Sequence, residues 1–383
     1  MMKVLMLDVS GTVPFYDVKL CNAVAVLPNV DLTLAMPLQT RKDYLWQSSP
    51  VSFKTTFLIP KLQFLLKLPS VLLVPYKCMR VLLNYILVFL HLIFHRYDVV
   101  HIQWLPFVKH ISIEYIFLRL YKAAAPKAKF VFTMHNMFPH DCKNKSAYQR
   151  RFNHHIKYFD AFIVHTQQSQ SDFHQIYGVP LDRIFVVWIG MFEADLSVCT
   201  PLPDTDKFRI VHFGNLTPYK GTDVLLNALQ QLPNNYKNQL EIILLGVIQG
   251  GYKQELISIS EGLNIKWFPY SVSDSMLWSH LHVADLIVFP YRAISQSGAL
   301  LLGLFFEKRL LTSDLPAFKE TLEGFHDHWF FKSEDVQDLA DKIVKHIDGV
   351  IPQNGMFGII KTLKQKYSWE QSAKDTIAVY REC

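Results

Sequence analysis

Cysteine is scarce in this sequence and shows none of the spacings that build metal or disulfide sites. The 383 residues include five cysteines, an odd number spread over the chain without a Cys-x-x-Cys pair: Cys21, Cys78, Cys142, Cys199 and Cys383. This pattern excludes a zinc ribbon or a disulfide-stapled fold and favours a reducing compartment. The chain opens on the apolar stretch KVLMLDVS without the features of a signal peptide, so we expect no export.

Runs of like charge are also missing. Charged residues make up 19% of the chain and hydrophobic residues 50%, which leaves ample material for large cores and no disordered tract. The net charge is +6, but the basic residues form no run that could follow a nucleic-acid backbone, so no nucleic-acid partner is expected. Gly-x-Ser-x-Gly and His-Glu-x-x-His are absent, which argues against hydrolases.

Acidic residues are absent between Tyr44 and Tyr97. Basic residues lie there among leucine, isoleucine, valine and phenylalanine, at Lys54, Lys61, Lys67, Lys77, Arg80 and Arg96. Within 76–98, Lys77, Asn84 and His91 recur every seventh residue, which predicts a helix with one narrow polar stripe. Because 14 residues separate Arg80 from His95 and a span needs about 20, we expect a helix that is buried or lies on a bilayer surface.

The order of elements predicts two α/β domains. Short apolar strands such as DVVHIQW and KFVFTMHN alternate with helices, and the alternation restarts at RIVHFGNL after the Pro- and Asp-rich stretch SVCTPLPDTDKF. Such alternation is typical of a parallel sheet covered on both faces. We predict a Rossmann-like, doubly wound domain over 1–197, a second over 198–365 and a final helix over 366–383 that crosses back to the first. The two domains are expected to face each other across a cleft, with ligands at the carboxyl ends of the strands.

Two turns in the second domain have the form of anion sites. In HFGNLTPYKG, Gly214 permits a tight turn out of a strand and Lys220 lies at the start of the next helix. In FPYRAISQSGALLLGL, a strand, a polar turn and a helix follow one another, so the backbone N–H groups of Ser297, Gly298 and Ala299 would face a ligand above the sheet. The alternative interpretations are a lysine that decorates a helix start and a serine that only caps a helix.

Histidines and acidic pairs offer weaker candidates. His135 follows a strand in VFTMHNMFPHD, with His140 five residues later, and could bond a sugar hydroxyl or a phosphate; His101 occupies a similar position. Each could equally be structural. The pair Asp204 and Asp206 and the histidines of 326–328 lack further ligands, so no metal site is expected.

Taken together, FGNLTPYKGTDVLLNAL, LIVFPYRAISQSGALLLGLFFEKRLLTSDLPAFKE, DVVHIQW and FTMHN resemble the GT-B glycosyltransferases, specifically the retaining family 4 (group 1). The resemblance implies that Lys220 binds the donor diphosphate, that His135 lies near the donor sugar and that the Gly11 loop closes over the reaction centre. It also places Tyr270 beside the nucleobase. The donor-binding residues that we expect are Gly11, Gly214, Asn215, Lys220, Tyr270, Ser295, Gln296, Ser297, Gly298 and Ala299.

The sequence departs from the family in two places. Asn215 stands where the family usually has an arginine, and the two usual glutamates fall near Ile294 and Leu302, neither of which is acidic. Sugar contacts would then come from amides and hydroxyls of the Ser-Gln-Ser-Gly turn. Arg292 is our candidate to replace the missing arginine.

The resemblance implies a transfer that needs no cofactor or metal. We expect Lys220, Arg292 and the helix N–H groups to stabilise the departing diphosphate while His135 orients the sugar. In the family, the leaving phosphate takes the acceptor's proton on the same face, which gives retention. The expected partners are a nucleotide sugar and a glycan or lipid-linked acceptor in surface polysaccharide or glycolipid synthesis.

The acid-free segment 44–97 predicts peripheral attachment to the inner face of the cell membrane from the cytoplasm. The alternative for that segment is a buried helix. Two other functions share the fold: a sugar-nucleotide epimerase, and a catalytically inactive homologue that only binds sugar nucleotides.

Overall fold

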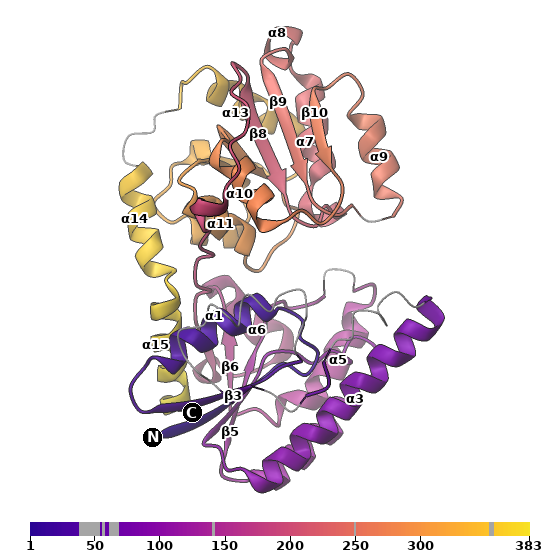
Figure 1. Ribbon diagram of the computed structural model, residues 1–383, viewed down its shortest axis with the longest axis vertical. Coiled ribbons are helices and arrows are strands. Elements are labelled where there is room, and N and C mark those ends of the chain that lie inside the picture. Colours follow the sequence, from indigo (N-terminus) through magenta and orange to yellow (C-terminus); the bar gives the residue numbers. More distant parts are fainter. Residues whose placement is uncertain (38–53, 56–57, 61–68, 140–141, 249, 352–355) are drawn as a thin grey trace. The chain divides into compact units, whose positions relative to one another are not determined.

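The computed structural model describes residues 1–383 except 38–53, 56–57, 61–68, 140–141, 249 and 352–355 (Figure 1). It divides the chain into two compact units. The first is formed by Met1–Gly190 with Tyr367–Cys383, and the second by Met191–Lys366. The passage from the first to the second unit therefore falls seven residues before the sequence-based boundary at 197.

The first unit is built on a fully parallel sheet of strand order β3-β2-β1-β4-β5-β6-β7. Its strands are β1 (Met2–Leu7), β2 (Val30–Ala35), β3 (Lys54–Thr55), β4 (Val99–Ile102), β5 (Lys129–Thr133), β6 (Ala161–Val164) and β7 (Ile184–Val186). Its helices are α1 (Pro14–Ala25), α3 (Ser70–Phe94), α4 (Glu114–Ala124), α5 (Lys145–Ile156), α6 (Gln167–Tyr177) and α15 (Trp369–Glu382). Strands β4 and β6 are buried at every residue, as expected for a sheet with helices on both faces.

The second unit repeats this design on a parallel sheet of order β10-β9-β8-β11-β12-β13. Its strands are β8 (Phe208–Phe213), β9 (Leu240–Leu245), β10 (Ile265–Phe268), β11 (Leu286–Phe289), β12 (Arg309–Ser313) and β13 (Phe330–Phe331). Its α-helices are α7 (Thr222–Gln231), α8 (Asn234–Lys237), α9 (Tyr252–Ile259), α10 (Asp274–His282), α11 (Gly298–Phe305), α12 (Pro316–Thr321), α13 (Val336–Ile347) and α14 (Met356–Lys366). The predicted fold class, two doubly wound Rossmann-like units, is confirmed.

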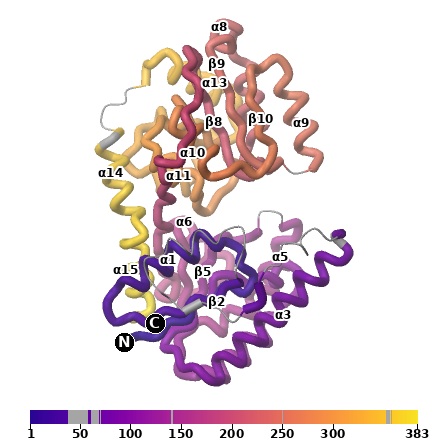
Figure 2. Tube along the Cα trace, viewed as in Figure 1, coloured from indigo at the N-terminus to yellow at the C-terminus, as the bar shows by residue number. Residues whose placement is uncertain are grey.

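The closing helix α15 belongs to the first unit, where Figure 2 shows it beside α1. Its indole Trp369 lies so close to Gly190 that a Cβ there would come within 2.2 Å of the ring. Further along the helix, the hydroxyl of Tyr380 is 2.6 Å from Nδ1 of His101 on β4. The C-terminus is therefore tied to the first unit by both ring packing and a buried hydrogen bond.

Helix α3 is longer than the sequence predicted and has an unusual distribution of side chains. It begins at Ser70, so the apolar stretch is not limited to the residues between Arg80 and His95. By length and composition alone, Val71–Phe94 could cross a membrane. The polar residues Arg80 and Asn84 face the protein and are buried, while apolar residues are exposed on the other side. The predicted polar stripe therefore points inward in its central part.

Candidate functional site

Lys220 is a buried cation at the carboxyl end of the second sheet. After β8, the chain turns at Gly214 (φ +111°) and forms a short 3-10 turn, Pro218–Lys220, before α7 begins. A Cβ at Gly214 would lie 2.5 Å from Lys220 Nζ, so the ammonium rests against the glycine backbone. Nζ also lies 4.9 Å from the ring centroid of Tyr291. The predicted pairing of Gly214 with Lys220 in one turn is therefore present.

No carboxylate neutralises Lys220 within the part of the chain that the structure describes, although the residue is only 8% exposed. Burial lowers the pKa of Lys220, but the hydroxyls of Tyr291 and Tyr219 more than offset this, and its pKa is raised overall. The side chain is thus charged at neutral pH. A buried, unpaired charge is costly unless a ligand completes it, so this position is suited to an anion.

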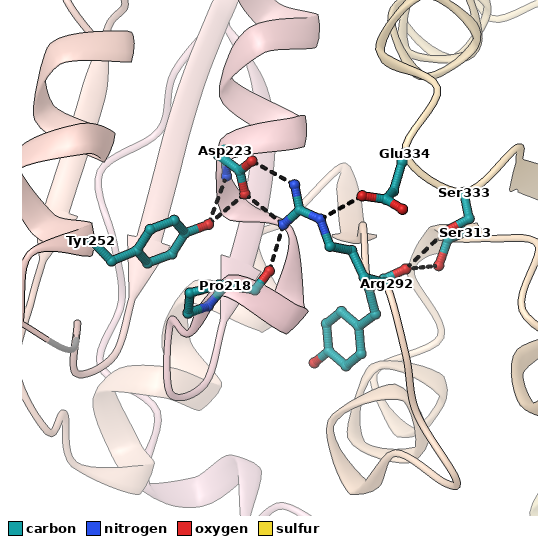
Figure 3. Close-up of polar contacts among 8 residues, drawn as sticks. Pro218, Asp223, Tyr252, Arg292, Ser313, Ser333 and Glu334 are labelled. Carbon is teal, nitrogen blue, oxygen red and sulfur yellow. Dashed lines mark hydrogen bonds and ion pairs between the residues drawn. The ribbon is translucent and has the colours of Figure 1, made fainter. Parts of the chain in front are cut away.

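Arg292, the predicted replacement for the missing arginine, has carboxylate partners within the protein (Figure 3). Its Nε donates to Glu334 at 2.8 Å, and Nη1 and Nη2 donate to the two oxygens of Asp223 at 2.9 and 2.6 Å. Nη1 also donates to the carbonyl of Pro218 at 2.5 Å. The hydrogen bond with Asp223, together with the one to Glu334, outweighs burial, which acts in the opposite direction, and raises the pKa of Arg292. Arg292 thus holds the turn that carries Lys220, and its role at a phosphate stays a prediction.

The network around Arg292 extends to helix α9. The hydroxyl of Tyr252 donates to Asp223 Oδ1 at 2.5 Å, and the backbone N–H of Asp223 donates back to that hydroxyl at 3.1 Å. Burial raises the pKa of Asp223, but its hydrogen bonds from Arg292 and Tyr252 outweigh burial, so its pKa is lowered. Figure 3 shows the side chains of Asp223, Tyr252 and Arg292 converging above Pro218 in that view. Asp223, Tyr252 and Glu334 are residues that sequence reasoning did not identify.

The Ser-Gln-Ser-Gly turn forms the start of α11. Ser297 caps the helix by accepting a hydrogen bond from the N–H of Leu300 at 3.2 Å, and its predicted contact with the donor stays a prediction. Gly298 lies against Phe192, whose ring would come within 2.2 Å of a Cβ at that position. The first-turn N–H groups of Gly298 and Ala299 have no acceptor inside the helix, by the geometry of an α-helix. The turn can therefore cap its own helix and still present donors to an anion.

Gln296 stands out in the same turn. Both polar atoms of its side-chain amide are buried, and neither has a hydrogen-bond partner. An unsatisfied buried amide costs roughly 1–3 kcal/mol per group. At the family's glutamate positions, Leu302 is buried in α11 and Ile294 is partly buried. Gln296 is thus the unsatisfied polar side chain nearest in sequence to the positions where the family has acids.

Tyr270 and Asn215 occupy more open positions. Tyr270 follows β10, is 52% exposed and meets Phe268 edge to face at 6.3 Å. Asn215 follows Gly214 and its carbonyl accepts from the hydroxyl of Thr217 at 3.4 Å. Nothing in the structure tests their predicted contacts with a nucleotide, which remain predictions.

His135 lies in a group of aromatic and imidazole rings at the end of β5. Its Nδ1 is 3.1 Å from Nε2 of His165, and its Nε2 is 3.1 Å from the side-chain amide of Gln103. Its ring stacks on Trp104 at 4.5 Å. A sugar hydroxyl at His135 would have to replace one of these partners.

The contacts of the histidine group constrain its protons. Nδ1 of His165 donates to the carbonyl of Val187 at 2.8 Å, so its Nε2 can accept from Nδ1 of His135. A neutral His135 has one N–H, so it donates either to His165 from Nδ1 or to Oε1 of Gln103 from Nε2. Burial, followed by His165 and His101, lowers the pKa of His135 well below its usual value. The ring is therefore neutral near pH 7 and does not act as an acid there.

Other histidine candidates are structural or undescribed. His101 is fully buried between Tyr380 and Thr133, and burial followed by His165 lowers its pKa to about 3. His140 lies outside the described residues. Sequence reasoning missed His165, Gln103 and Trp104, although each also follows a strand end and could have been found by that signal.

The Gly11 loop joins β1 to α1 and is organised by Asp8. Gly11 has φ +61°, and the N–H groups of Ser10, Gly11 and Thr12 donate to the Asp8 carboxylate at 3.0, 2.9 and 2.6 Å. Asp17, in the first turn of α1, is fully buried and neither of its oxygens has a hydrogen-bond partner. Burial and the neighbouring Asp8 raise the pKa of Asp17 well above its usual value. Asp17 therefore stays protonated beneath the loop.

Because Asp17 is protonated in the folded protein, the free energy of unfolding falls as the pH rises. Above pH ~4 the unfolded chain ionises Asp17 while the folded protein keeps it neutral, so the folded state loses stability until its raised pKa is reached. We expect Asp17→Asn to flatten this decline and to be more stable than the wild type at pH 7. Urea midpoints measured from pH 4 to 8 test this, with Asp182→Asn, an exposed position, as the control. Parallel slopes for Asp17→Asn and wild type would contradict the assignment.

Two doubly wound sheets, with a glycine turn, a buried cation and a helix N-terminus following β8 and β11, are the arrangement of a GT-B glycosyltransferase. The chain belongs to the group 1, family 4 glycosyltransferases. Residues 207–348 match the family model described as "Glycosyl transferases group 1", and residues 54–191 match "Glycosyltransferase Family 4".

Known proteins similar to this chain are distant in sequence. A GDP-mannose:glycolipid 4-beta-D-mannosyltransferase of Xanthomonas campestris pv. campestris is 21% identical over 258 residues, covering 64% of this chain and 69% of that protein. A glycosyltransferase from Rickettsia africae superimposes with a TM-score of 0.70 at 15% identity, over 100% of this chain and 98% of that one. Anabaena HepE in complex with UDP-glucose gives 0.70 at 17% identity, over 99% and 100%. The structural matches support the fold.

Proposed function

We propose that this glycosyltransferase moves a sugar from a nucleotide-diphosphate sugar to a glycan or lipid-linked acceptor in surface polysaccharide or glycolipid synthesis. The observation that carries the proposal is Lys220, a buried cation without a carboxylate partner in the described chain, at the carboxyl end of β8. A diphosphate supplies the missing negative charge. The Xanthomonas relative, named for GDP-mannose and a glycolipid, supports GDP-mannose as the first donor to test.

In this proposal the second unit binds the donor and the first unit binds the acceptor. Lys220 and the N–H groups of Gly298 and Ala299 bind the diphosphate, while Tyr270 lies beside the nucleobase. The unsatisfied amide of Gln296 takes over contacts that a glutamate makes elsewhere in the family. An amide can both donate and accept, so it suits sugar hydroxyls without adding negative charge beside the phosphates.

The proposed chemistry requires a stabilised leaving group. The bond between the anomeric carbon and the diphosphate oxygen breaks, a bond to the acceptor hydroxyl oxygen forms, and the acceptor's proton passes to a leaving phosphate oxygen. Lys220 stabilises the charge that develops on that phosphate. We propose that the anomeric configuration is retained and that neither metal nor cofactor is needed. Among the described residues, no group of three or more histidine, cysteine, aspartate or glutamate side chains is arranged to hold a metal ion.

The first unit has a surface suited to a lipid-linked acceptor. The outer face of α3 exposes Val71, Leu72, Met79, Leu83, Ile86, Leu90, Ile93 and Phe94. Val74, on the same side as the buried Val81 and Val88, is also exposed near the N-terminal end. Helix α4 packs against α3, where Tyr85 stacks on Phe117 at 4.8 Å, and it exposes Tyr115, Ile116 and Leu120. Exposed Lys77 and Arg96 add positive charge to a segment without acids. We propose that this α3–α4 face binds the anionic inner leaflet from the cytoplasmic side. Within the segment 44–97, residues 44–53, 56–57 and 61–68 lie outside the described residues.

A panel of GDP- and UDP-sugars tests the proposal. We expect GDP-mannose to raise the melting temperature, since ligand binding stabilises the native state, and to release GDP only with a lipid-linked acceptor. The anomeric coupling in the product's NMR spectrum decides retention, and unchanged turnover in EDTA supports a metal-free reaction. An isomerised donor would instead identify an epimerase, and binding without turnover an inactive homologue.

A further inference from the structure

The inner face of α3 is polar where it meets the Gly11 loop. Asn84 is fully buried there and uses both ends of its amide: Nδ2 donates to the carbonyl of Val9 at 3.0 Å, and Oδ1 accepts from the N–H of Ile59 at 2.8 Å. One turn earlier, Nη2 of Arg80 donates to the carbonyl of Ser10 at 3.4 Å. The carbonyls of two successive loop residues are thus bonded to one helix.

Asp8 holds the same loop from its other side. Its carboxylate accepts from the backbone N–H groups of Ser10, Gly11 and Thr12. The loop is therefore fixed through its N–H groups by Asp8, the residue after β1, and through its carbonyls by α3. Movement of α3 would release the carbonyls while leaving the Asp8 contacts in place.

The described part of the protein packs only loosely on the N-terminal turns of α3. None of the side chains of residues 71–79 is buried, and burial begins at Arg80 and Val81. The contacts with the loop therefore start at the turn of α3 where burial begins. A partner that covers the exposed apolar turns of α3 therefore also orients Arg80 and Asn84, the two side chains that hold the Gly11 loop.

We propose that Asn84 and Arg80 are positioning residues through which α3, once its outer face lies on an anionic lipid surface, orders the Gly11 loop for transfer. The occupant is a lipid surface because the exposed face is apolar and the surrounding segment has basic residues and no acids. This inference rests on the proposed function, and it adds that the surface activates the enzyme as well as locating it.

Hydrogen–deuterium exchange over residues 8–13, with and without vesicles of anionic phospholipid, tests the inference. For the wild type we expect vesicles to slow exchange in this peptide at least threefold. Asn84→Asp keeps the acceptor for Ile59 but loses the donor to Val9, so its loop should exchange faster and no longer respond to vesicles. Val88→Ala, a buried change on the same helix face one turn beyond Asn84, is the matched control and should respond like the wild type.

Sedimentation with the vesicles and nucleotide-sugar binding are measured on the same samples. If Asn84→Asp binds vesicles and its loop still responds like the wild type, the positioning role is wrong. The lipid role is wrong if wild-type protein binds vesicles without any change in loop exchange, or does not bind them. If the wild type does not bind nucleotide sugar, the proposed function is wrong, whatever the hydrogen exchange of the loop shows. A lower kcat on vesicle-borne acceptor in Asn84→Asp, with KM for the donor unchanged, is the expected kinetic signature.

Discussion

Lys220→Met should lower the rate of sugar transfer by about 10²–10³, the range found when one preorganised donor to a developing oxyanion is removed. Methionine fills a similar volume without the charge, and Lys220 has no ion pair in the described chain to lose. The melting temperature of the unliganded protein should therefore stay within about 2 °C of the wild type. The stabilisation by nucleotide diphosphate, by contrast, should largely disappear.

Lys345→Met is the matched control for this substitution. Lys345 lies in the last turn of α13 and is exposed, so the variant has the same change of net charge in the same unit. It should bind nucleotide and turn over like the wild type. If Lys220→Met transferred sugar as fast as the wild type, the assignment of Lys220 to the diphosphate would be wrong. A large fall in the melting temperature of this variant would show that Lys220 contributes to stability instead.

Features that depend on neighbouring residues in the chain could be predicted from the sequence. The turn with Gly214 and Lys220 follows from a strand, a glycine and a helix start within 13 residues, and the structure brings the two residues into contact. The cap at Ser297 has the same local origin. Local patterns thus located both turns, because backbone geometry at a strand end leaves few alternatives.

Features that depend on distant partners could not be predicted. Arg292 follows the strand as expected, but its carboxylate partners Asp223 and Glu334 are 69 and 42 residues away, so the sequence did not show that its charge was already compensated. His135 was correctly placed at a strand end, yet its neighbours His165 and Gln103 come from two other strand ends. The positions of titratable residues at strand ends therefore predict which side chains lie close together. They do not predict which of those side chains already have hydrogen-bond partners within the protein.

Helix α3 shows the same limit for a periodic pattern. The spacing of Lys77, Asn84 and His91 identifies one stripe, and periodicity alone does not decide whether the stripe or the opposite face meets the core. Burial of hydrophobic side chains would put the stripe outside. The structure places Asn84 inside because its amide satisfies Val9 and Ile59, whose backbone groups would otherwise lack partners in the interior. The result is an apolar surface on α3 that is exposed in the described part of the first unit.

Replacing Leu83, Ile86 and Leu90 together by glutamate should separate surface binding from chemistry. These side chains are 40%, 45% and 45% exposed on the outer face of α3, so the folded protein should lose little stability. Their contact with lipid is worth roughly 2–3 kcal/mol, which corresponds to about 30–150-fold in affinity, and the added negative charges would repel an anionic leaflet. We expect loss of vesicle sedimentation and a similar fall in transfer to a vesicle-borne acceptor.

The same triple variant should bind nucleotide sugar like the wild type, because the predicted donor residues other than Gly11 lie in the second unit and the three substitutions are on the outer face of α3. A control with the same charge change replaces Leu181, Leu196 and Ile257 by glutamate, three other aliphatic side chains that are 49–52% exposed. That control should keep both vesicle binding and transfer. If instead both triple variants lost vesicle binding equally, net charge would explain attachment and the α3–α4 face would have no special part in it. Loss in the α3 variant alone would show that attachment depends on apolar contact at this face.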